Sequence, residues 1–288
     1  MDALAFGALA FALLLLLIGP VRRALADTLV VIRWEHALFA AVAIVAVRHA
    51  WKSSPSIFVS VAFWQSELIR HPSLTDALLA FWLTRPAVLG VGLLAVVTIG
   101  LSPHAEPTSG SALNGLPNRF DAGWYAGIAA EGYDWQYRFD RQQNIAFFPA
   151  YPMLLRAGGW IAGAFQPGVP EETRIARLAW TGAVLSSVAF FVACWYFSRL
   201  AREFLEPTRA SAAVLLLASY PFAIFYSAPY TESLFLLSAV GSWYHFRHRQ
   251  WARAAFWGVL IGLTRPNGFF LSVPLALLAL GTPEAGGA

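Results

Sequence analysis

The chain has 288 residues, of which 58% are hydrophobic and 12% are charged, and its formal net charge is +4. An ordinary soluble domain is about 25% charged and about 45–50% apolar, so this composition excludes a soluble globule of this size. The apolar runs lack the alternating period of barrel strands, which predicts an all-α membrane protein. The positive charge is expected from loop arginines on the cytoplasmic side, so no nucleic-acid partner is predicted.

A helix needs about 20 residues to cross a bilayer. The candidates for such spans are the apolar segments 3–20, 28–50, 77–101, 178–198, 210–228, 232–246 and 254–280. Two further stretches, 56–69 and 150–165, are shorter or more polar, and each is expected either to span or to lie at the interface. The chain is therefore expected to be a polytopic membrane protein.

Arginine placement predicts the orientation of the later spans. The links 199–209 and 247–253 each carry three arginines, whereas the link 227–233 between them carries no lysine or arginine. Basic links face the cytoplasm, so the third link is expected outside. Arg85 is expected to extend towards the cytoplasm from its span, which places residues 102–177 in a large extracytoplasmic loop. The orientation of the earlier spans stays open.

Motif 1 is the polar stretch 118–135, NRFDAGWYAGIAAEGYDW, which lies between strongly apolar segments. Helical spacing puts Asp121, Trp124 and Tyr125 on one face of a short helix, and Gly132 is expected to end it. Either Asp121 is the N-cap of an interfacial helix, or it belongs to a functional site.

Motif 2 is AFFPAYPMLLR, residues 146–156. Its two prolines are predicted to prevent a regular helix through 149–152. Irregular backbone near a membrane must be buried in protein or line a wet cavity, and the alternative is a turn leading into a helix.

Motif 3 is YPFAIFYSAPYTESLF, residues 220–235. One interpretation makes Ser227 or Thr231 the cap of the next helix, with Glu232 in its first turn. The other places Tyr230, Thr231 and Glu232 in a site on the same side as motif 1.

Motif 4 is GLTRPNGFF, residues 262–270, within an apolar segment that its Pro-Asn-Gly sequence is expected to interrupt. A cation at this depth needs an anion or a water-filled cavity. Arg265 is therefore expected either to form a structural ion pair with Glu232 or Asp121, or to bind a phosphate through its guanidinium fork.

Signature motifs of nucleotide and metal sites are absent from the sequence: there is no Walker A loop, Rossmann glycine fingerprint, HExxH helix or CxxC pair. The histidines show no ligand spacing, so no metal ligands are assigned. Without a nucleotide-binding fold, a sugar transferase would have to use a donor that reaches it from the membrane.

The four motifs, in this order, resemble the PIG-V-type mannosyltransferases, the GPI mannosyltransferase II family and its bacterial relatives, which belong to the GT-C class of polytopic glycosyltransferases. The matching residues are RFDAGWYAGIAAEGY (119–133), FFPAYPMLLR (147–156), PFAIFYSAPYTESLF (221–235) and GLTRPNG (262–268). Residues 1–75 are expected to be an added transmembrane or interfacial segment, and 76–288 the GT-C-like domain. Family members usually carry further C-terminal spans, and whether this chain is a C-terminal truncation stays open.

The resemblance implies transfer of mannose, or another hexose, from a polyprenyl- or dolichyl-phosphate-linked donor to a glycan or lipid acceptor. Transfer would occur on the extracytoplasmic side, and alanine- and arginine-rich usage favours a bacterial inner membrane. Asp121 would be the general base. Arg265, with Arg119 second, would stabilise the leaving phosphate, and no nucleotide cofactor is expected. The other predicted substrate-binding residues are Asn267, Trp124, Tyr125, Tyr133, Tyr151, Tyr230, Thr231 and Glu232.

Two other function classes compete with a transferase. A transporter or flippase for a lipid-linked or anionic solute should show inverted repeats and paired broken helices, whereas the sequence indicates one broken helix. A non-catalytic membrane scaffold gives no reason for Asp121 and Arg265 to converge. The transferase interpretation requires these two side chains to meet beside a common cavity.

Overall fold

The computed structural model describes residues 70–98, 116–136, 140, 142–271, 273, 274 and 277. Contacts divide the chain into two units, residues 1–72 and 73–288, and the helices described below form the second. The predictions for the segments 3–20, 28–50 and 56–69 lie outside the described residues. Within the described ranges the regular structure is helical and contains no strand, as the composition predicts.

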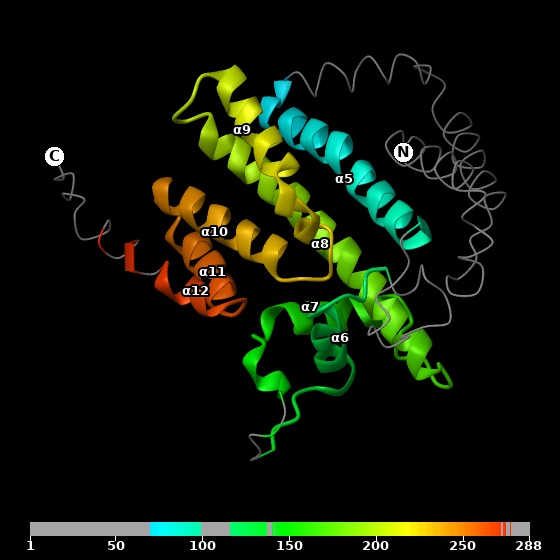
Figure 1. Cartoon of the computed structure of the whole chain (residues 1–288). Coiled ribbons are helices and arrows are strands. Elements are labelled where there is room, and N and C mark those ends of the chain that lie inside the picture. Colours follow the sequence, from blue (N-terminus) through cyan, green and yellow to red (C-terminus); the bar gives the residue numbers. More distant parts are fainter. Residues whose placement is uncertain are drawn as a thin grey trace, which may run out of the picture. The chain divides into compact units, whose positions relative to one another are not determined.

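The described helices are arranged around α8, the longest of them, which contacts α6, α7, α9 and α10 (Figure 1). The elements are α5 (Pro72–Thr98), α6 (Ala122–Glu131), the 3₁₀ helix η1 (Asn144–Ala146), α7 (Ala150–Ile161), α8 (Glu171–Ala201), α9 (Pro207–Ser219), the 3₁₀ helix η2 (Pro221–Tyr226), α10 (Glu232–Arg247), α11 (Trp251–Gly262) and α12 (Pro266–Phe270). One core joins α6, α7, α8 and α10, and a second joins α5, α8 and α9.

Among the described helices, α5 and α8 are long and apolar enough to cross a membrane. They contain 27 and 31 residues and overlap the predicted spans 77–101 and 178–198. Trp82, Leu83 and Val91 on α5 are 62%, 63% and 67% exposed. Exposed apolar rows of this kind fit contact with hydrocarbon rather than with water.

Two predicted spans are each divided into two helices. The segment 210–228 forms α9, which has 13 residues, and then η2, with an extended Tyr220 between them. The segment 254–280 forms α11 and then α12, with an extended Arg265 at the break. The second break is the one that motif 4 predicts, whereas the first was not expected. The count of broken helices therefore no longer separates a transferase from a transporter.

Arg85 lies at the first break. Its Nη1 donates to the Ala223 carbonyl at 2.6 Å and to Ser227 Oγ at 3.2 Å, and its Nη2 donates to the Ala218 carbonyl at 2.6 Å. The last carbonyls of a helix have no partner within it, and this guanidinium supplies one. The expectation that Arg85 extends towards the cytoplasm is wrong, since the residue is 5% exposed. The prediction that residues 102–177 lie on the extracytoplasmic side therefore rests on the arginine-bearing links alone.

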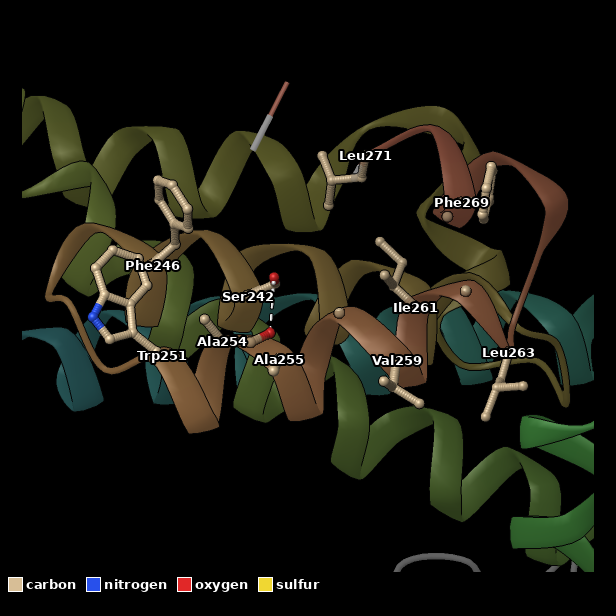
Figure 2. Close-up of a pocket in the computed structure, with 13 residues that line it drawn as sticks. Ser242, Phe246, Trp251, Ala254, Ala255, Val259, Ile261, Leu263, Phe269 and Leu271 are labelled. Atoms are coloured by element: carbon tan, nitrogen blue, oxygen red, sulfur yellow. Dashed lines mark hydrogen bonds between the residues drawn. The ribbon is translucent and has the colours of Figure 1, made fainter. Parts of the chain in front are cut away.

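The second break borders an open apolar cavity of about 620 Å³ between α10, α11 and α12 (Figure 2). Phe246, Trp251, Ile261, Phe269 and Leu271 are among its lining residues, and Ser242 Oγ there donates to the Ala254 carbonyl at 3.2 Å. The residues that line this cavity carry no charge, so it offers no groups for acid–base chemistry.

Candidate active site

Asp121 stands at the head of α6, and Gly132, with φ of 90°, ends that helix, as the sequence predicts. The Asp121 carbonyl accepts the amides of Trp124 at 3.0 Å and Tyr125 at 3.3 Å. Its side chain makes no capping hydrogen bond, because the residue has helical backbone angles rather than the extended ones of a usual N-cap. The exposed carboxylate has no hydrogen bond or ion pair within the described part of the chain. It is therefore available to a substrate.

Tyr230, from motif 3, fixes the backbone on both sides of Phe120. Its hydroxyl accepts a hydrogen bond from the Asp121 amide at 3.0 Å and donates one to the Arg119 carbonyl at 3.0 Å. Phe120 has φ of 48° and is 90% exposed. This left-handed conformation costs an L-residue about 1–2 kcal/mol, so the hydroxyl stabilises a strained turn. Burial raises the pKa of Tyr230 to about 12, which keeps this hydroxyl protonated.

Replacing Tyr230 by Phe is expected to release this turn. Two hydrogen bonds at about 0.5–1.5 kcal/mol each give a loss of about 1–3 kcal/mol in local stability. Amide hydrogen exchange at residues 119–122 should accelerate, because the Asp121 amide and the Arg119 carbonyl both lose their hydrogen-bond partner. Tyr196→Phe is the matched control, since it removes a hydroxyl that pairs with His245 at 3.0 Å. Equal exchange in both variants would contradict this positioning role.

An aromatic cluster centred on Tyr125 joins motifs 1, 2 and 3. Its ring is T-shaped against Phe147 at 5.1 Å, Tyr151 at 5.2 Å and Tyr230 at 6.2 Å between centroids. Burial raises the pKa of Tyr125, while a hydrogen bond with Thr231 and the positive charge of Arg265 act in the opposite direction. The negative charges of Asp121 and Glu232 also raise the pKa of Tyr125, so Asp121, Glu232 and Arg265 all lie close enough to this phenol to influence it.

Arg265 forms the ion pair that was one of its two predicted alternatives. Its Nη2 pairs with Glu232 Oε1, and its Nε donates to Thr231 Oγ1 at 2.6 Å. Thr231 is fully buried at the N-cap of α10, yet its hydroxyl accepts the hydrogen bond from Arg265 and does not cap the helix. Arg265, at the break between α11 and α12, thus links motif 4 to motif 3. Neither Asp121 nor Arg265 lines a cavity described for this part of the chain, so the expected shared cavity stays a prediction, although both charges act on the pKa of Tyr125.

Motif 2 packs against motif 4 through the backbone, because the Ala150 amide donates to the Leu263 carbonyl at 3.0 Å. The prediction that residues 149–152 cannot be helical is wrong. Helix α7 begins at Ala150 with Pro149 as its N-cap, and Pro152 lies in its first turn. Amides of the first turn have no partner within a helix, so a proline is tolerated there.

The other residues predicted to bind substrate range from buried to exposed. Tyr151 is 2% exposed, and its hydroxyl contacts the Gly182 carbonyl at 3.0 Å and Ser186 Oγ at 2.9 Å, which places it in the core. Tyr133 is 47% exposed and donates to the Phe147 carbonyl at 2.7 Å. Trp124 stacks on Phe147 at 5.6 Å, and Asn267 is exposed on α12.

Gly182 on α8 is a site residue that the sequence analysis does not identify. Its missing side chain allows motifs 2 and 3 to pack closely against the central helix. A Cβ at this position would lie 2.5 Å from Pro229 Cβ and 3.0 Å from Tyr151 Oη.

The described residues contain no cluster of three or more His, Cys, Asp or Glu side chains placed to hold a metal ion.

Comparison with known protein families matches residues 105–277 to the mannosyltransferase (PIG-V) family. The match covers more than half of the chain and includes all four motifs. Comparisons with curated proteins and with solved structures give no match. Two apolar helices long enough to cross a membrane fit a membrane-bound enzyme. The chain therefore belongs to the PIG-V mannosyltransferase family, and it is a glycosyltransferase.

Proposed function

We propose that this enzyme transfers mannose from a polyprenyl- or dolichyl-phosphate-linked donor to a hydroxyl group of a glycan or lipid acceptor. The observation that carries the proposal is the free carboxylate of Asp121 on a turn that Tyr230 fixes. Asp121 takes the proton of the acceptor hydroxyl as its oxygen attacks the anomeric carbon. The bond between that carbon and the phosphate oxygen breaks, and the lipid phosphate leaves as an anion.

The leaving phosphate needs positive charge more than it needs a proton. Arg265 already has the carboxylate of Glu232 as its partner, whereas Nη2 of Arg119 is buried without a partner in the described part of the chain. We therefore assign phosphate stabilisation to Arg119 first. Arg265 keeps a positioning role, because it orders Thr231 and Glu232 beside Tyr125.

Membrane vesicles that contain the full chain test the donor and the side of transfer together. The expected result is transfer of labelled mannose from polyprenyl-phosphate-mannose, and none from nucleotide-activated mannose when synthesis of the lipid donor is blocked. An impermeant acceptor should be glycosylated only when the extracytoplasmic face is accessible. Direct transfer from the nucleotide donor would contradict the proposed donor class, and transfer on the cytoplasmic face would contradict the proposed orientation.

A further inference from the structure

A second cavity, of about 310 Å³, lies beside motif 1. Its walls come from α5, α8 and η2 and from the residues that precede α6. The lining is mostly apolar and includes Leu89, Gly92, Leu116, Ala183 and Ile224. Leu89 is itself 45% exposed on a helix long enough to cross a membrane, so the apolar wall continues onto a surface that suits hydrocarbon.

Two of the lining residues carry unused hydrogen-bond donors. Arg119 Nη2 and Trp180 Nε1 are both buried, and neither has an acceptor within the described ranges. Buried polar groups in native proteins are almost always hydrogen-bonded, so two free donors at one apolar cavity indicate a ligand that supplies acceptors. A guanidinium and an indole N–H both donate and do not accept, which favours an anionic oxygen group.

We propose that this cavity binds the phosphate and the first isoprene units of the donor lipid, with the phosphate accepting hydrogen bonds from Arg119 and Trp180. This inference rests on the proposed function. Arg119 and Asp121 flank Phe120, and Tyr230 contacts the backbone of both at 3.0 Å. A phosphate at Arg119 therefore brings the sugar carbon attached to it close to the carboxylate. The apolar lining takes the start of the prenyl chain, and the rest of the chain extends along α5 into the bilayer.

Photo-crosslinking of the purified full chain with a sugar-free polyprenyl phosphate tests this site without requiring catalysis. The label is expected on peptides of α5, α8 and η2 that line the cavity, with binding at least about tenfold tighter than that of the matching polyprenol. Arg119→Gln should remove this preference, and Trp180→Phe should weaken it. Ala183→Phe, which fills the cavity, should reduce labelling by both lipids.

Arg209→Gln is the matched control, because Arg209 is exposed in the first turn of α9 and does not line the cavity. It should retain the wild-type preference. Unchanged phosphate preference in Arg119→Gln and Trp180→Phe, with thermal unfolding at the wild-type temperature, would overturn the proposal. So would displacement of the lipid by inorganic phosphate at equal concentration, since that would indicate a site for free phosphate.

The outcome is separable from that of the proposed function. If the lipid phosphate labels the cavity selectively but the protein transfers no sugar, the transfer reaction is refuted and the lipid site is supported. Sugar transfer from the lipid donor with the label on other helices would refute the lipid site and support the transfer reaction.

Discussion

Asp121→Asn is expected to slow sugar transfer by about 10²–10⁴-fold, the range over which a general base contributes to a reaction rate. The amide has the size of the carboxylate but cannot accept the acceptor's proton. The wild-type carboxylate has no hydrogen bond or ion pair within the described residues, so the unfolding temperature should not change. Initial rates with a labelled polyprenyl-phosphate sugar and thermal unfolding in detergent measure the two effects.

Asp134→Asn provides the matched control for that variant. Asp134 is also exposed and follows the same helix, and its backbone amide donates to Asn144 Oδ1 at 3.1 Å. The substitution leaves that hydrogen bond intact and should leave the transfer rate close to that of the wild type. A loss confined to Asp121→Asn supports the role of a base, whereas equal rates in the two variants would remove Asp121 from the mechanism.

Gly268→Ala is expected to lower the free energy of unfolding by about 1–3 kcal/mol or more, as overpacking does in protein cores. A Cβ at this position would lie 2.1 Å from the Ile261 carbonyl oxygen and 3.0 Å from the Gly262 nitrogen. These are backbone atoms, so a change of rotamer cannot relieve the overlap. Helix α12 must move away from α11, which carries Arg265 away from Glu232 and slows transfer as well.

Gly262→Ala is the control for this close approach. A Cβ there would meet no heavy atom within 4 Å, and the residue ends α11 only six positions before Gly268. Alanine favours a helix over glycine by up to about 1 kcal/mol, so this variant should be neutral or slightly more stable. Similar losses of unfolding temperature in both variants would contradict the contact between the two helices.

Features that depend on a few neighbouring residues could be predicted from the sequence. The length and hydropathy of α5 and α8 identify them as candidate spans among the described helices, because these properties require no knowledge of a partner. Asp121 and Gly132 were placed correctly at the ends of α6 by turn chemistry and helical spacing. The break at Arg265 follows from the proline next to it, which keeps the preceding residue extended.

A proline also marks the break before η2, which a prediction from hydropathy misses. Tyr220 precedes Pro221 and is extended, with φ of −68° and ψ of 156°. Hydropathy measures the apolar content of a segment and does not detect an interruption within it. It therefore predicts a single span for residues 210–228. The proline could have located this break.

Partners that are distant in the sequence could not be predicted. Arg85 donates to carbonyls more than 130 positions away, and local hydropathy gives no indication of that contact. The choice between an ion pair and a free Arg265 depended on where Glu232 lies, which is a property of packing. The sequence around Trp180 does not indicate whether its N–H has a partner, and only the structure shows that it is unpaired within the described residues.

The anomeric configuration of the product tests most directly the claim that Asp121 activates an acceptor hydroxyl for a single displacement at the sugar carbon. NMR of the product formed from a donor of known configuration provides that measurement. The proposed mechanism predicts a configuration opposite to that of the donor, since the hydroxyl attacks the face away from the leaving phosphate. A product that retains the donor's configuration would contradict a single displacement from the opposite face, and with it the proposed attack of an acceptor hydroxyl that Asp121 has deprotonated.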